Sequence, residues 1–375
     1  MNAQQLDNAI REIAERDLLE NKVFGSAYGV IQDGNTVYKK CFGHTSPDTR
    51  CEVTGKTLFR LASMTKPVTA VAALILIDRG LLSLNDPVSK YLPAFGNIHH
   101  KELDEAGSLA DFGPVRNEIT VCHLLTHTSG IGSDLVKQEK FLTDADRASR
   151  SAMLEFYCKI GADFEPGTKQ SYSATGAFDV LVAVIEKVAK TDFPTFLQRE
   201  ILGPCGMADT TFSPTEEQWE RMIKMHDRID GKNAVGEMKP GCVFEDFPCA
   251  HYPGGAGLAS TLDDYMKFAE MLLKRGKIGQ KTLISEKTMR LMSETYVSKE
   301  MMPWNEKWGL SVRVVTEDSY PYLPVGSFGW SGAYGAHFWI DPKNRIAAVF
   351  MKNSRVDGGA GNESARAFEK AVYSA

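Results

Sequence analysis

Segments typical of β-strands lie near both ends of this chain, and a long stretch of helical patterns separates them. The first two strand-like segments are joined by Asp33-Gly34-Asn35, a hairpin signal because glycine tolerates positive φ. The strand-like segments are residues 25–32, 36–42, 308–315, 326–330, 336–340 and 346–351. The helical patterns are residues 3–20, 121–126, 145–159, 174–189, 193–202 and 261–273. A sheet must therefore assemble from opposite ends of the sequence.

This arrangement predicts an α/β (α+β) fold: a largely antiparallel sheet flanked by helices, with an inserted all-helical domain. We expect residues 1–84 and 254–375 to form a discontinuous α/β domain and residues 85–253 to form the insertion. The cleft between two such units is the expected place for a functional site.

Charge and cysteine usage exclude several classes of function. The net charge of -5 gives no basic stripe, so we expect no nucleic-acid partner and no attraction to an anionic membrane. The longest apolar run, residues 68–77, is far shorter than the roughly 20 residues of a membrane span and predicts a buried core helix. The polar N-terminus and seven scattered cysteines without a CxxC pair favour a cytoplasmic protein with reduced thiols.

Residues 59–67 combine a serine, a lysine and a proline at spacings that suit a reactive site. Pro67 is tolerated only in a first helical turn, which places Ser63 at a helix start with Lys66 on the same face. A serine hydroxyl becomes a good nucleophile when a neighbour accepts its proton, and a lysine can do so when burial lowers its pKa from about 10.4. The apolar helix that follows can supply that burial.

The pattern S-x-x-K is short, and by itself it also fits a capping serine beside a solvated lysine. Four further segments accompany it in this chain: His123-Leu124-Leu125-Thr126-His127-Thr128-Ser129-Gly130-Ile131, Pro166-Gly167 before Tyr172-Ser173-Ala174, Gly255-Ala256-Gly257-Leu258 and Trp330-Ser331-Gly332. With these, most of the chain resembles the serine β-lactamases and penicillin-binding proteins. The resemblance is to class C β-lactamases, their DD-peptidase relatives and the family VIII carboxylesterases, and it is strongest to the last group.

The resemblance implies a β-lactamase/transpeptidase-like fold and a role for each matched residue. Ser63 corresponds to the nucleophile and Lys66 to its activating partner, while Tyr172 corresponds to the residue that relays a proton to the leaving group. Relatives build the oxyanion hole from two backbone amides, here those of Ser63 and Ala333. Apart from the resemblance, Tyr172 could also be a core tyrosine near a helix start.

Two departures from the family pattern bear on substrate choice. Trp330-Ser331-Gly332 stands where relatives carry Lys-Thr-Gly, and Ala174 stands where β-lactamases carry an asparagine. We expect these four residues to contact substrate, although Trp330 would also fit a half-buried strand aromatic. Losing a cation and an amide donor disfavours substrates with a free carboxylate and favours esters.

Other catalytic arrangements find less support. The chain has no G-x-S-x-G and no G-x-G-x-x-G, so neither an α/β-hydrolase elbow nor a dinucleotide cradle is indicated. His123 and His127 have a spacing that could chelate a metal, but no glutamate follows the first histidine as in zincins. We therefore expect no metal and no cofactor.

Together these residues predict a serine hydrolase that forms an acyl-enzyme through Ser63 and acts on a small ester or amide. A carboxylesterase acting on small uncharged esters is favoured. The alternatives are a β-lactamase or D-amino-acid peptidase (DD-peptidase), an acyltransferase, and a relative that keeps the fold without turnover. The natural acyl group, the immediate base and the oligomeric state stay open.

Overall fold

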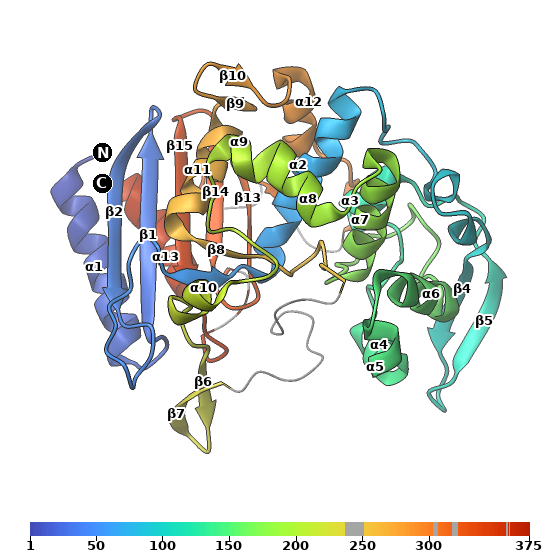
Figure 1. Ribbon diagram of the computed structural model, residues 1–375, viewed down its shortest axis with the longest axis horizontal. Coiled ribbons are helices and arrows are strands. Elements are labelled where there is room, and N and C mark those ends of the chain that lie inside the picture. Colours follow the sequence, from blue (N-terminus) through green and yellow to red (C-terminus); the bar gives the residue numbers. More distant parts are fainter. Residues whose placement is uncertain (237–250, 303–306, 317–321, 358, 360) are drawn as a thin grey trace.

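The computed structural model describes residues 1–236, 251–302, 307–316, 322–357, 359 and 361–375 (Figure 1). Its centre is a seven-stranded sheet with the order β11-β12-β13-β14-β15-β1-β2, in which every neighbouring pair is antiparallel. The strands are β1 (Gly25–Gln32), β2 (Asn35–Gly43), β11 (Lys307–Trp308), β12 (Arg313–Val314), β13 (Phe328–Ser331), β14 (His337–Asp341) and β15 (Ile346–Lys352). The predicted antiparallel sheet built from both ends of the chain is confirmed.

Helices cover both faces of this sheet. On β1, Ala27 and Ile31 belong to the larger core with α11 (Leu262–Leu273), whereas Tyr28 and Val30 belong to a second core. The second core is closed by α1 (Ala3–Leu19) and α13 (Glu363–Ser374), which lie together at one side of the molecule in Figure 1. Alternate residues of a strand point to opposite faces, and because both faces are covered, β1 is buried continuously from Gly25 to Ile31.

The helix after Ser63 is α2 (Thr65–Asp78), which has buried residues on all sides. A helix that is apolar all round belongs in a core, and α2 packs between α7 (Gly176–Ala189) and α12 (Glu286–Arg290). The predicted buried core helix is therefore present, and it carries Lys66 in its first turn.

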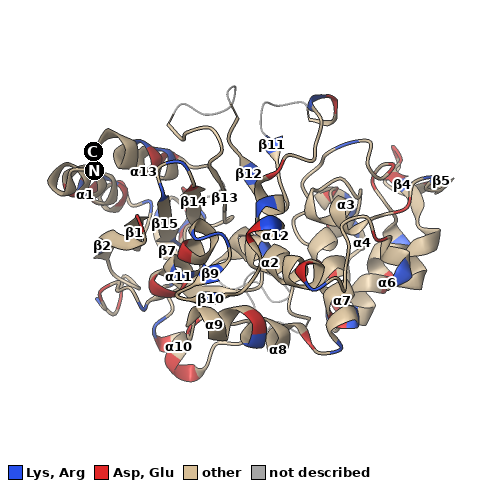
Figure 2. Ribbon diagram, turned by 90° about the horizontal axis from the view of Figure 1, so that it is seen from above, with Lys and Arg blue, Asp and Glu red and all other residues tan. Residues whose placement is uncertain are grey.

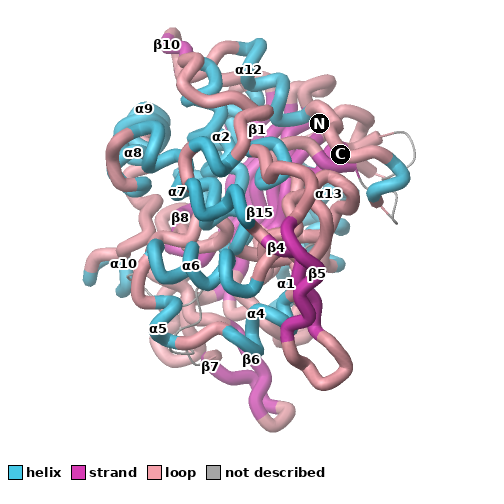
Figure 3. The backbone as a smooth tube through the Cα atoms, turned by 90° about the vertical axis from the view of Figure 1, so that its right-hand side faces the viewer, coloured by secondary structure: helices cyan, strands magenta, loops and turns pink. Residues whose placement is uncertain are grey.

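Most of the remaining helices lie at the end of the molecule away from α1, and Figure 3 views this end directly. They are α3 (Val121–Leu125), α4 (Leu135–Phe141), α5 (Asp144–Arg147), α6 (Arg150–Ile160) and α7 (Gly176–Ala189), whereas α8 (Phe193–Leu197) lies nearer the middle in Figure 1. The division of the chain at residues 84 and 253 remains a proposal, and residues 237–250 of the predicted insertion lie outside the described part.

The structure differs from the expected elements in several places. The expected single helices over 145–159 and 193–202 are each interrupted, the second by a π-helical turn at Gln198–Leu202. The expected strand over 308–315 is instead the two short arms β11 and β12, because Ser311 takes a φ of 67° between them. Short hairpins also occur within the middle of the chain: β4 (His99–Leu103) with β5 (Leu109–Pro114), and β6 (His226–Ile229) with β7 (Lys232–Val235).

Charged residues of both signs are spread over the elements, as Figure 2 shows. Within the described ranges, the helices include none whose length and apolar character would let it cross a bilayer.

Candidate active site

Ser63 lies in a short 3-10 turn, Ala62–Met64, between strand β3 (Leu58–Arg60) and α2. Ala62 takes a φ of 45°, a left-handed conformation that is uncommon for residues other than glycine. The turn is held on both sides, because Leu61 N–H donates to the Leu258 carbonyl (2.9 Å) and the buried Asn353 side chain bonds both backbone groups of Arg60. Ser63 remains partly exposed at this rigid turn.

The three residues expected to act together are adjacent. The Ser63 Oγ accepts a hydrogen bond from the Tyr172 hydroxyl at 2.7 Å and lies 3.3 Å from Lys66 Nζ. Lys66 Nζ also lies 4.9 Å from the centre of the Tyr172 ring. The structure thus brings Ser63, Lys66 and Tyr172 into one hydrogen-bonded group, although Tyr172 is 109 residues from Ser63.

Lys66 is fully buried, and this burial lowers the pKa of its amine. Its Nζ donates to the backbone carbonyls of Ala174 (2.6 Å) and Gly255 (2.8 Å). An added Cβ at Gly255 would lie 2.7 Å from the Ala174 carbonyl oxygen and 3.3 Å from Lys66 Nζ, so only glycine leaves room for this arrangement. Two backbone carbonyls therefore fix the lysine side chain, and the third hydrogen-bonding direction of its Nζ faces the Ser63 hydroxyl.

Trp330 borders the group on β13. Its indole Nε1 donates to the Tyr172 hydroxyl at 3.2 Å, and its ring packs on Tyr172 (5.5 Å between centroids) and on Trp308 (4.5 Å). The tryptophan expected to contact substrate therefore lies beside Tyr172, and its N–H is already bonded to the Tyr172 hydroxyl. Trp308 is a neighbour that the sequence patterns did not single out.

The turn after β13 closely approaches the Ala62–Met64 turn that carries Ser63. A Cβ at Gly332 would lie 2.4 Å from the Leu61 carbonyl oxygen, and the side chains of Tyr334 and Ala62 share a small buried cluster. Ala333, between these contacts, is exposed, and its carbonyl accepts from Gly359 N–H at 2.9 Å. Ala333 and Ser63 therefore sit on two touching turns, as an oxyanion hole made from their amides requires.

We predict that Gly332→Ala lowers kcat/KM for any ester substrate by at least about tenfold, because shifting two backbone turns misplaces the reacting groups. The added methyl group cannot be accommodated without moving the Leu61 carbonyl. Steady-state kinetics check this, with the exposed Gly96→Ala as control, since Gly96 meets only the Ser89 side chain. Wild-type kinetics in Gly332→Ala would contradict the close approach.

Two of the expected substrate-contacting residues are placed differently from Trp330. Ser331 points to the opposite face of the sheet, where its Oγ bonds His337 Nδ1 (2.8 Å) and His337 Nε2 bonds Glu369 (3.0 Å). This follows from strand alternation, because neighbours on β13 face opposite ways. The structure does not bring the Ser331 side chain to Ser63, and Ala174 contacts Lys66 through its backbone carbonyl.

Patterns in the sequence did not identify some residues that contact the site. His127 belongs to a segment quoted above for the family resemblance and was otherwise weighed as a metal ligand, with no role at the site. It packs on Tyr172 with 4.5 Å between ring centroids, and Phe178 lies under Lys66 Nζ at 5.3 Å. The spacing of His123 and His127 could have drawn attention to the loop, but the partner of His127 lies 46 residues away at Ser173.

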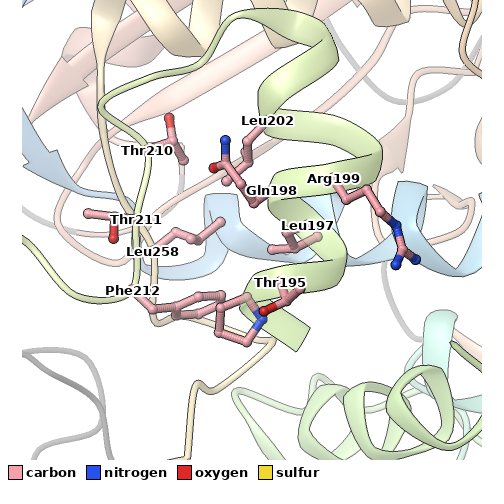
Figure 4. A pocket seen from close by; sticks show the side chains of 10 residues that line it. Thr195, Leu197, Gln198, Arg199, Leu202, Thr210, Thr211, Phe212 and Leu258 are labelled. Atoms are coloured by element: carbon pink, nitrogen blue, oxygen red, sulfur yellow. The ribbon is translucent and has the colours of Figure 1, made fainter. Parts of the chain in front are cut away.

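A separate pocket of about 420 Å³ lies beside the π-helical turn (Figure 4). Its lining residues are Pro194, Thr195, Leu197, Gln198, Arg199, Leu202, Thr210, Thr211, Phe212 and Leu258. Leu258 links this pocket to the Ala62–Met64 turn, because its carbonyl accepts from the N–H of Leu61 just before that turn. None of the expected catalytic residues lines this pocket.

Comparison with known proteins gives a consistent match over nearly the whole chain. The family model described as Beta-lactamase matches residues 6–371. Esterase EstB of Burkholderia gladioli is 26% identical over 386 residues, covering 96% of this chain and 94% of the relative. The structure of EstCE1, described as a hydrolase with promiscuous acyltransferase activity, superposes with a TM-score of 0.83 at 24% identity and covers 99% of both chains. A family VIII carboxylesterase superposes with a TM-score of 0.78 at 19% identity, covering 98% of this chain and 96% of the other.

Proposed function

The chain belongs to the beta-lactamase family, and we propose that within this family it is a carboxylesterase that cleaves small uncharged esters through an acyl-Ser63 intermediate. The family includes esterase relatives such as EstB. The observation that carries the choice of esters is Trp330, whose indole contacts Tyr172 where family members with a Lys-Thr-Gly motif carry a lysine.

The surroundings of Lys66 suit a base that accepts the Ser63 proton. In the neutral amine, the two N–H bonds can point to the Ala174 and Gly255 carbonyls, which leaves the lone pair directed at the Ser63 hydroxyl. Burial lowers the pKa of Lys66 and so increases the neutral fraction at a given pH. Lys66 and Tyr172 both contact the Ser63 oxygen, and in the proposed mechanism both take part in moving its proton.

The proposed reaction then proceeds in two steps. Ser63 Oγ bonds to the substrate carbonyl carbon and passes its proton to the Lys66–Tyr172 pair, while the amides of Ser63 and Ala333 hold the oxyanion. The carbon–oxygen bond to the alcohol breaks, and the Tyr172 hydroxyl delivers the proton to the departing alkoxide. Water then attacks the carbonyl carbon of the acyl-Ser63 ester and passes its proton to the Lys66–Tyr172 pair. The pair returns a proton to Ser63 Oγ as the bond to the acyl group breaks, which releases the carboxylic acid.

Trp330 and Ala174 support a preference for uncharged substrates. The Trp330 N–H is bonded to Tyr172, so this position offers substrate an apolar ring in place of a cation. The Ala174 methyl group cannot donate a hydrogen bond to an acylamino side chain. A charge-assisted hydrogen bond contributes about 1.5 to 3 kcal/mol, so its loss can change specificity roughly ten- to more than a hundredfold.

We predict that p-nitrophenyl butyrate is cleaved with a kcat/KM at least about a hundredfold above that for a chromogenic cephalosporin. The reason is that Trp330 cannot make the charge-assisted contact that a lysine at this position would make with the cephalosporin carboxylate. Both substrates are measured in one preparation. Labelling of Ser63 by a fluorophosphonate, read by intact mass, distinguishes an enzyme from a relative without turnover. A cephalosporin value equal to or above the ester value would replace the esterase proposal with a β-lactamase.

A further inference from the structure

His127 contacts Tyr172 and both of its neighbours in the chain, Ser171 and Ser173. Its backbone carbonyl accepts from Ser171 N–H at 3.0 Å, and its Nδ1 accepts from Ser173 N–H at 3.1 Å. Between these two bonds, its ring packs on the Tyr172 ring with 4.5 Å between centroids. One residue thus holds the backbone on both sides of Tyr172 and one face of its side chain.

His127 adopts an unusual backbone conformation to make these contacts. Its φ is 58°, and it is only 1% exposed. A left-handed conformation in a residue other than glycine persists where surrounding contacts fix it, and such residues are frequent at functional sites. Besides Tyr172, the rings of Phe178 (5.5 Å) and Trp308 (5.0 Å) enclose the imidazole.

The contacts also specify the protonation state of the ring. Nδ1 accepts a hydrogen bond, so it carries no proton, and the Ser173 amide assigns the ring proton to Nε2. Burial and the nearby Lys66 charge both hold the pKa of His127 well below its usual range. The imidazole therefore serves as a neutral acceptor beside Lys66.

We propose that His127 is a positioning residue, which holds the Tyr172 hydroxyl at hydrogen-bonding distance from Ser63 by fixing both neighbouring amides and the Tyr172 ring. The inference rests on the proposed role of Tyr172 in proton transfer. It gives His127 a function in turnover that is distinct from metal binding and from general packing of the core.

The test compares variants that separate the side-chain contacts from the backbone conformation. His127→Gly removes the ring and the Nδ1 acceptor while tolerating positive φ. His127→Asn keeps an acceptor oxygen at the same number of bonds from the backbone, and asparagine also tolerates this conformation. His123→Asn is the matched control, because the His123 Nδ1 accepts from Thr120 N–H within its own helix turn, on a different partner from the Ser173 amide that His127 binds.

We expect His127→Gly to lower kcat for p-nitrophenyl butyrate by about a hundredfold with KM changed by less than about threefold, as for a misplaced catalytic group. We expect the kcat of His127→Asn to be at least about tenfold higher than that of His127→Gly, and the kcat of His123→Asn to lie within about threefold of the wild-type value. The thermal unfolding temperature of each variant shows whether a lower kcat reflects a loss of folded protein. Failure of His127→Asn to recover activity would overturn the assigned role of the Ser173 contact.

A double-mutant comparison separates positioning from packing. If His127 acts through Tyr172, adding His127→Gly to Tyr172→Phe lowers the residual kcat by less than about threefold, because one function is removed twice. A further loss of about a hundredfold in the double variant would overturn the positioning role. The proposed function fails separately, if Ser63→Ala retains full esterase activity.

Discussion

Replacing Ser63 with alanine is expected to lower kcat for p-nitrophenyl butyrate by at least about 10⁴-fold and to prevent fluorophosphonate labelling. The change removes the oxygen that both Tyr172 and Lys66 contact, while the other contacts of the turn remain. The fold is expected to persist, because the hydroxyl is partly exposed and Leu61 and Arg60 still anchor the turn. Initial rates, intact mass after labelling and thermal unfolding measure the three effects.

Ser213→Ala is the matched control for this experiment, since Ser213 is an exposed serine on the loop before α10 (Glu216–Glu220). It should label at the wild-type rate and keep wild-type turnover. Substantial turnover or labelling in Ser63→Ala would place the nucleophile at a different residue.

Lys66→Ala and Tyr172→Phe should each lower kcat by roughly 10³-fold or more, and the double variant should lose far less than the product of the two losses. The reason is that Lys66 and Tyr172 contact the same Ser63 oxygen and each other, so either change disables the same proton path. Single-turnover acylation measured with p-nitrophenyl butyrate in all four proteins checks this expectation.

Lys66→Ala also leaves the carbonyls of Ala174 and Gly255 without their shared donor, so its unfolding temperature must be measured beside its activity. Tyr172→Phe keeps the ring that packs on His127 and Trp330 and removes only the hydroxyl. Multiplicative losses in the double variant would show that the two residues serve separate steps.

Local sequence signals were sufficient where neighbouring residues determine the structure. The hairpin of β1 and β2 forms around Gly34, whose φ is 79°, and the strands bracket it as the turn signal predicted. Pro67 and the apolar run after it gave the start and the burial of α2, and with them the adjacency of Ser63 and Lys66. These features depend on short-range geometry that the chain carries in each segment.

Features that depend on contacts between distant segments could not be predicted from local sequence patterns. Nothing local to Trp308 shows that it packs on Trp330, and nothing local to His127 shows that it bonds Ser173. Ser331 was grouped with Trp330 because the two are adjacent in a motif, but strand alternation sends Ser331 toward His337 on the other face. Such relations follow from tertiary packing, which overrides what short patterns indicate.

The bonds between Arg60 and Asn353 also impose an order on how the site is made. During synthesis from the N-terminus, Ser63 and Lys66 emerge early, whereas Asn353 and the strand β15 that pairs with β1 come near the end of the 375-residue sequence. Contacts of such long sequence separation form slowly, because the intervening chain must first be closed into a loop. If Ser63 is the nucleophile that we propose, we therefore expect its turn to lack the Asn353 anchor until the C-terminal strands have been made and paired.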